Sequence, residues 1–204
     1  MIRYLLISTL IVAVSCRTSV PSASSTEKNC ASTLMKLDSI RGWYSAKIDV
    51  YEKHLSGLLL IKNMPDGSVR LVFTNEAGIS FFDLEFDAHG KFSVKKIIRQ
   101  LDRGPVINTL KTDFALLLGI PFRKDTPLVS VREGELYHGV RQKKDEAYFI
   151  TDMECASLQR LGIAADTKEK VTITPGGEQN LFDNLIIKHK LFDMAIALTK
   201  IKSN

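Results

Sequence analysis

Apolar and polar residues alternate along the chain from Gly42 onward, with the period of two that a half-buried antiparallel sheet requires. The first segment places Tyr44, Ala46, Ile48 and Val50 on one face and polar residues on the other. Four more segments follow up to about residue 97, most of them separated by turns that contain Pro, Asp, Asn or Gly. The pattern predicts a five-stranded meander with one polar and one strongly apolar face.

The apolar face of this meander is the candidate wall of an internal cavity. The side chains expected to line it are Ile48, Val50, Leu58, Leu60, Leu71, Phe73, Phe82, Leu84 and Phe86. The strand around Leu58–Ile61 is apolar on both sides, so we expect it to be covered on both faces. An apolar strand face belongs to a closed core far more often than to a ligand site, and a closed core is therefore the alternative.

A helix is predicted over residues 105–118, where apolar residues recur at helical spacing. Pro105 suits its first turn, and Gly119 and Pro121 end it. Leu110, Phe114 and Leu117 form the stripe expected to cover the sheet as a lid, whereas Lys111 and Asp113 are expected to face solvent. Residues 30–38 are a candidate for a second, short helix.

Shorter strands are predicted after the helix, at residues 129–134, 136–141, 146–152, 170–174, 183–189 and 192–201, and the segment ASLQRLGIA fits either a helix or a strand. A meander of this length cannot stay flat, because neighbouring strands twist by about 20–25°. The sequence therefore predicts an α+β, mainly antiparallel β fold. Its strongly curved sheet forms an incomplete, half β-barrel with one or two short helices over or inside the concave face. So few helices leave an incompletely filled, apolar interior.

The first 15 residues have the features of a signal peptide, with Arg3 ahead of an apolar run from Tyr4 to Val14 that is too short to span a bilayer. Small residues stand directly before Cys16, and this arrangement resembles a bacterial lipobox. The resemblance implies cleavage before Cys16 and an acylated Cys16 that holds the protein on a membrane. The alternative is an ordinary signal peptide that is cut nearby. Residues 16–29 form a flexible Ser/Thr-rich tether, and residues 30–204 form a single domain.

Composition narrows the classes of partner. The 204 residues, 45% apolar and 25% charged, suffice for one globular domain with a sizeable core. The net charge is +5, but the basic clusters lack the interleaved aromatic residues of nucleic-acid sites, so we expect no nucleic-acid partner. Histidines and cysteines lack metal-ligand spacing, and no metal or cofactor is expected.

Cysteine pairing and catalysis are both weakly indicated. In an oxidising compartment Cys30 and Cys155 could form a disulfide, or Cys155 could be a small buried hydrophobe. A hydrolase would need a nucleophile and a base, for which Ser157 or the pair Asp83 and Glu85 could be nominated. None of them lies in the context of a nucleophile elbow or a triad, so we expect no enzyme.

The run VRLVFTNEAGISFFDLEF, with a strand before it and a strand and a helix ending in LLLG after it, resembles the LolB-type outer-membrane lipoprotein receptors and their LolA-like carrier relatives. The resemblance covers Leu37–Gly119 best and implies a periplasmic half-barrel whose lidded concave face receives the acyl chains of lipoproteins. The receptors carry a protruding leucine in the loop between two of these strands. The matching loop here contains Glu76 and Ala77, and alanine exposes too little apolar area to insert into a membrane.

The sequence thus predicts a monomeric, membrane-anchored lipoprotein that binds acyl chains or amphiphilic cargo, either lipid or lipoprotein, in an apolar cavity. Its expected location is the cell envelope, on the outer membrane and facing the periplasm, because the tether lacks acidic residues directly after Cys16. Ala77 leaves the delivery of cargo in doubt. The alternative is a structural or assembly lipoprotein of the envelope with a closed core and no ligand.

Overall fold

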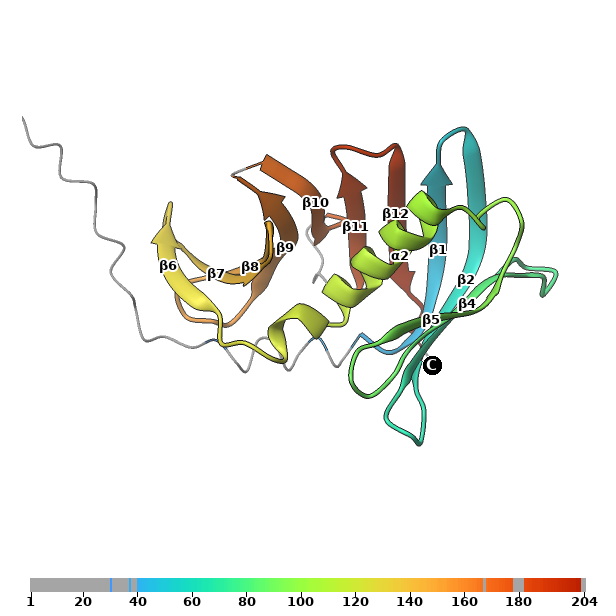
Figure 1. The fold of residues 1–204 in the computed structure, drawn as a ribbon, viewed down its shortest axis with the longest axis horizontal. Helices are drawn as coiled ribbons and strands as arrows, with labels where there is room; N and C mark the ends of the chain where they lie inside the picture. The colour runs from blue at the N-terminus through green and yellow to red at the C-terminus, as the bar shows by residue number, and fades with distance from the viewer. Residues whose placement is uncertain (1–29, 31–36, 38–39, 167, 178–181, 203–204) are drawn as a thin grey trace, which may run out of the picture.

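The computed structural model describes residues 30, 37, 40–166, 168–177 and 182–202. These residues form one 12-stranded antiparallel sheet and one α-helix (Figure 1). The helix is α2 (Gly104–Leu117), and the short 3-10 turn η2 (Ile120–Phe122) follows it. The strands are β1 (Gly42–Val50), β2 (Lys53–Asn63), β3 (Val69–Thr74), β4 (Ser80–Phe86), β5 (Phe92–Ile97), β6 (Leu128–Arg132), β7 (Glu135–Gln142), β8 (Asp145–Thr151), β9 (Leu158–Ala165), β10 (Lys168–Pro175), β11 (Asn184–His189) and β12 (Met194–Lys200).

The sheet consists of two meanders that meet at β1 and β12. The strand order is β5-β4-β3-β2-β1-β12-β11-β10-β9-β8-β7-β6. β1 and β12 pair antiparallel, from Tyr44 opposite Lys200 to Val50 opposite Met194. As a result β5 and β6, which follow one another in the described chain, lie at the two opposite edges of the sheet.

Helix α2 lies in the link between these two edges and runs across one face of the sheet (Figure 1). The sheet curves without closing, since β5 and β6 remain unpaired to each other. The predicted fold, a curved and incompletely closed antiparallel sheet with a helix over its concave face, is confirmed.

The sequence signals at the ends of the helix act as expected. Pro105 lies in the first turn of α2, and Gly119 adopts the left-handed conformation, with a φ of 66°, just after the helix ends. The segment that fitted either a helix or a strand is β9, which pairs with β8 and β10. Most of the candidate helix at residues 30–38 lies outside the described residues.

One continuous apolar core fills the space between α2 and the sheet. Phe114 of α2 meets Phe82 of β4 with ring centroids 6.0 Å apart, and the ring of Phe82 in turn lies 5.4 Å from that of Phe73. The core extends past η2, where the ring of Phe122 lies 5.2 Å from that of Phe149. The apolar face of the first meander and the stripe of the helix therefore bury one another.

A disulfide joins Cys30 to Cys155, whose Cα atoms lie 5.3 Å apart. Cys155 belongs to the turn between β8 and β9, and 125 positions of sequence separate the two residues. The bond therefore ties the start of the domain to a distant turn in the second meander. Of the two states that the sequence allowed for Cys155, the structure has the paired one.

We expect reduction of this disulfide to lower the free energy of unfolding by about 2–5 kcal/mol, because the bond closes a long loop in the unfolded chain. Urea unfolding followed by circular dichroism, with and without dithiothreitol, measures the difference. The double variant Cys30→Ser, Cys155→Ser is the control and should not respond to the reductant. Equal midpoints for the oxidised and reduced protein would contradict the expectation.

Candidate functional site

The face that β2 turns toward the core differs from the prediction. Leu58 and Leu60 were expected to line the cavity, but Leu59 and Ile61 are buried there instead, with 0% and 1% exposure. Leu59 lies opposite Tyr44 of β1 and Phe73 of β3, and both of these residues face the core. Leu58 is 36% exposed on the outer face, and Leu60 lies there opposite Trp43. Because the strand is apolar on both sides, its own sequence does not say which side faces inward.

The other predicted lining residues face the side of the sheet that the alternation predicts, where they are packed in the core. Seven of the nine are at most 3% exposed and belong to the main core, namely Ile48, Val50, Leu71, Phe73, Phe82, Leu84 and Phe86. The predicted lid residues Leu110, Phe114 and Leu117 are buried on the side of α2 that faces the sheet. The structure therefore brings the predicted wall and the predicted lid together as one packed interface.

Asp113 corrects a second expectation, because it lies inside this interface and not in solvent. Its side chain is fully buried, and its Oδ2 lies 3.0 Å from Nε2 of His189, which is 9% exposed. The other carboxylate oxygen of Asp113, Oδ1, is buried and has no hydrogen-bond partner among the described residues. The carboxyl group of the lid helix thus contacts an imidazole of the sheet in the middle of an apolar region.

The sequence does contain a signal for this pair. Asp113 is three positions after Leu110 and four before Leu117, so helical spacing places it on the apolar stripe. His189 follows Leu185 and Ile187 at the period of two that defines the core face of β11. Aspartate and histidine are residue types that suggest exposure to solvent, whereas the positions of Asp113 and His189 in the apolar pattern indicate the interior. Burial raises the pKa of the Asp113 carboxyl, an effect that the contact with His189 opposes.

A pocket of about 420 Å³ lies at one end of the interface between helix and sheet. It is lined by Val50, Tyr51, Glu52, Lys53, Gln100, Arg103, Val106 and Asp193, which come from the β1–β2 hairpin, the link from β5 into the start of α2, and the β11–β12 turn. Val50 and Val106 are buried members of the main core, whereas the charged residues around them are exposed. We call this pocket the mouth, because it adjoins both the apolar interior and solvent.

Aromatic contacts connect the mouth to the buried Asp113–His189 pair. Tyr51, which lines the mouth, makes an edge-on contact with Phe192 at a centroid distance of 5.0 Å. The ring of Phe192 lies 6.4 Å from that of His189. The mouth and the Asp113–His189 pair therefore belong to one contiguous part of the molecule.

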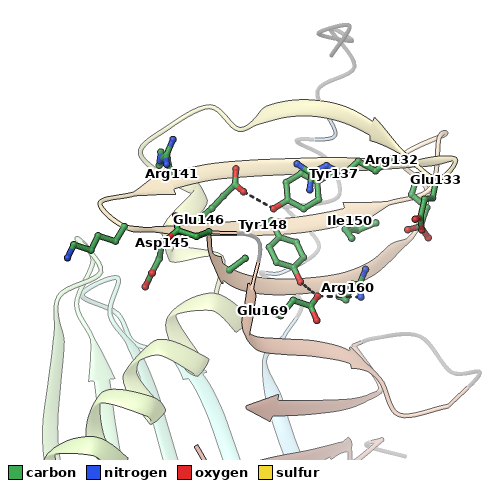
Figure 2. Close-up of a pocket in the computed structure, with 14 residues that line it drawn as sticks. Arg132, Glu133, Tyr137, Arg141, Asp145, Glu146, Tyr148, Ile150, Arg160 and Glu169 are labelled. Atoms are coloured by element: carbon green, nitrogen blue, oxygen red, sulfur yellow. Dashed lines mark hydrogen bonds and ion pairs between the residues drawn. The ribbon is translucent and has the colours of Figure 1, made fainter. Parts of the chain in front are cut away.

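A second pocket, of about 510 Å³, lies over β6 to β10 on the face opposite to the core (Figure 2). Its floor holds Tyr137 and Tyr148, whose rings stack 5.0 Å apart. The Tyr137 hydroxyl donates to Glu146 at 2.9 Å, and the Tyr148 hydroxyl donates to Glu169 at 2.7 Å. The guanidinium of Arg132 lies 3.5 Å from the centre of the Tyr137 ring. We call this pocket the trough. The hydrogen-bonding groups of the two tyrosines on its floor are paired with neighbouring carboxylates.

Glycines make room for the stacked rings of the trough. Tyr148 lies between Gly139 of β7 and Gly162 of β9 in the strand register. A Cβ atom on Gly162 would collide with the Tyr148 ring. The sequence analysis did not find this arrangement, because it depends on which residues become neighbours across three strands.

Several remaining predicted residues lie away from the interface. Glu76 and Ala77 are exposed in the β3–β4 turn, where Ile79 is also 59% exposed, so this loop does present one large apolar side chain. Cys16, the predicted lipidation site, lies outside the described residues.

The structure gives the nominated catalytic residues other roles. Asp83 makes a two-pronged ion pair with Arg70, with both distances 2.7 Å, and Glu85 pairs with Lys95 at 2.8 Å. The Ser157 hydroxyl donates a hydrogen bond to Asp152 in the β8–β9 turn. Within the described ranges, no group of three or more metal-ligating side chains comes together, and no helix is long and apolar enough to cross a membrane.

Comparison with known proteins adds one finding. No family model and no curated protein matches the sequence. Among solved structures, the crystal structure of a LolA superfamily protein from Nitrosomonas europaea is similar, with a TM-score of 0.50 and 8% sequence identity over 87% of this chain and 95% of that chain. The chain has a LolA-like fold.

The sequence resemblance and the structural comparison both indicate a LolA-like fold. At 8% identity the likeness concerns the arrangement of the sheet and helix, and it does not separate receptors from carriers. Within this LolA-like fold, the interface between α2 and the sheet, with its mouth, is the candidate functional site.

The corrected face of β2 gives a matched pair of variants. We expect Leu59→Ala to destabilise the protein by about 2–5 kcal/mol, because it removes a fully buried side chain. Leu58→Ala, one position away on the outer face, should cost less than about 1 kcal/mol. Urea unfolding of both variants measures the difference. A larger loss of stability for Leu58→Ala than for Leu59→Ala would mean that Leu58 faces the core, as expected from the sequence.

Proposed function

We propose that this protein is a lipid-anchored envelope protein that binds an acyl chain, or another amphiphile with a long apolar chain, between α2 and the sheet. The mouth would admit the ligand, and the apolar interior would receive its chain. No catalytic step is part of this function.

The interface between α2 and the sheet is the observation that carries the proposal. α2 has 14 residues, too few for a stable helix without tertiary packing, and its buried side contributes Val106, Leu110, Phe114, Leu116 and Leu117. Among the described residues, one polar side-chain contact joins α2 to the sheet, the Asp113–His189 pair. A helix held mainly by non-directional apolar contacts can exchange them for contacts with a hydrocarbon chain.

The mouth supports the same function. Its volume of about 420 Å³ lies within the range of small-molecule sites, and it combines buried valines with exposed charged residues. An amphiphile needs such a boundary, because its chain leaves water while its head group stays in it. Tyr51, 49% exposed at this boundary, offers an aromatic surface to the entering chain.

Membrane attachment through Cys16 is the second part of the proposal, and the sequence before Cys16 supports it. An acylated Cys16 would keep the domain within reach of lipid, at the end of the Ser/Thr-rich tether of residues 16–29. We propose the outer membrane, facing the periplasm, as the location.

A structural lipoprotein with a closed core is the second candidate function. One observation favours it: the seven predicted lining residues are already packed in the core, and Val50 alone among them borders either pocket described above. In this case the protein would act through its surface, and α2 would stay in place.

Ligand binding separates the two candidates. We expect the purified protein to bind the fluorescent fatty acid cis-parinaric acid saturably, with palmitate as a competitor. Tyr51→Asn should weaken binding about fivefold, because it removes an apolar surface worth about 1 kcal/mol at the mouth. Asparagine suits this position, where φ is 52°.

The matched control for this experiment is Trp43→Ala. Trp43 is 46% exposed, close to the 49% of Tyr51, but it lies on the outer face and should leave the affinity unchanged. Absence of saturable binding by the wild-type protein would favour the closed-core candidate.

The anchor has its own test. We expect the protein expressed in a bacterial host to partition into the detergent phase of Triton X-114 and to carry an acylated N-terminal Cys16 by mass spectrometry. Cys16→Ser should move it to the aqueous phase, because no acyl chain can then be attached. Detergent partitioning that survives this substitution would contradict an anchor at Cys16.

A further inference from the structure

The Asp113–His189 pair is the one ionisable contact found between α2 and the sheet in the described part of the chain. Its Oδ2–Nε2 distance is 3.0 Å, and the two side chains are 0% and 9% exposed. Apolar residues surround Asp113 on the helix, where Leu110 and Leu117 lie one turn away on either side. Removing one member of a buried pair leaves the other without compensation, so the pair is sensitive to its own protonation.

We propose that Asp113 and His189 form a proton-dependent latch that holds α2 over the apolar interior and controls when the interior opens. The proposal rests on the amphiphile-binding function above, whose site the latch would regulate. Neither residue is assigned a contact with the ligand. Both are positioning residues that act through α2.

The charge state that keeps the lid closed follows from burial. With one proton shared between the carboxyl and the imidazole, the closed interface holds either two opposite charges or none. With no proton it buries a lone carboxylate, and with two protons a lone imidazolium, and both are costly in an apolar interior. Burial raises the pKa of Asp113, which is the direction that keeps a proton on the closed pair.

In the proposed open state both groups would be in water. A free aspartate carboxyl in water loses its proton near pH 3.9 and a free imidazole near pH 6.5. Between these values the open and closed states hold the same number of protons, so pH has no effect on the lid. Above about pH 6.5 the open state gives up a proton that the closed state retains, and opening becomes about tenfold more favourable per pH unit.

Other charged groups near the pair are exposed or already paired. On β10 the residue opposite His189 is Val171, and Lys170 beside it forms an ion pair with Asp145 at 2.6 Å. The remaining charged neighbours along α2, β11 and the β11–β12 turn are exposed, namely Lys111, Lys188, Lys190 and Asp193. Among the described residues, His189 is the one titratable group whose contact lowers the pKa of Asp113, against the effect of burial.

Two of the other three histidines, His54 and His138, provide controls for a pH experiment. His54 forms an ion pair with Asp49 at 2.6 Å, but these side chains are 80% and 55% exposed, so this pair has the same chemistry without burial. Burial lowers the pKa of His138 to about 4, and it therefore stays neutral at the pH values of the experiment.

The test measures the affinity of the uncharged fluorescent amphiphile N-phenyl-1-naphthylamine for the purified protein between pH 5 and pH 8. A ligand that binds only the open state has an apparent affinity proportional to the open fraction. Hydrogen exchange of the α2 amides, corrected for the intrinsic pH dependence of exchange, reports opening without any ligand.

Four variants test the latch against the wild type. Wild-type affinity should rise about fivefold from pH 6.5 to pH 7.5, because the open state is already half deprotonated at pH 6.5. Asp113→Asn reverses the direction, so that acid below about pH 6.5 opens the lid, because His189 must then be neutral when buried. The double variant Asp113→Leu, His189→Leu should show no pH response, and His54→Asn should follow the wild type. His189→Gln, the alternative if Asp113→Asn does not fold, moves the onset of opening from about pH 6.5 toward about pH 4.

The outcomes separate the latch from the ligand-binding function. A wild-type affinity that does not change with pH, or a double variant that responds like the wild type, overturns the latch while ligand binding stands. If the probe binds at no pH but the exchange of α2 still reverses its pH response in Asp113→Asn, the latch stands and the ligand-binding function falls.

Discussion

The two strands that flank α2 in the chain lie at opposite edges of the sheet, and the rest of the structure depends on this constraint. A flat sheet of 12 strands would be about 53 Å wide, and the 30-residue link that contains α2 has to run from one edge to the other. Curvature shortens the distance between the edges and turns one face inward. The helix must then cross that face, and so a single element covers the interior from one meander to the other.

Such a covering element is held by what it buries. α2 is too short to be stable alone, so its position depends on apolar contacts with the sheet. A buried ionisable pair such as Asp113 and His189 adds little net stability compared with well-packed apolar residues, but removing one partner is costly. The interface therefore combines non-directional apolar contacts with one directional polar contact, that of Asp113 with His189. This combination is what makes α2 a candidate for controlled movement.

Local patterns in the sequence predicted the first meander, the helix and the curved sheet, because alternation and helical spacing depend on near neighbours. They did not settle β2, which is apolar on both faces, so that only its pairing with β1 and β3 fixes Leu59 and Ile61 as core residues. Asp113 was misplaced because its residue type outweighed its position on the stripe. The β1–β12 pairing and the disulfide join residues far apart in sequence, and the trough depends on the register between adjacent strands, so no local periodicity predicts them.

The disulfide also determines how the domain would respond to tension. A pull on the chain ahead of Cys30 reaches Cys155 and the β8–β9 turn through a covalent bond, before any load falls on β1, which starts at Gly42. Strand β1 forms the seam with β12, and peeling it from one end would separate the two meanders. The cross-link diverts the force to the opposite meander, so a domain tugged from its amino-terminal side is loaded at a turn and keeps its central seam intact.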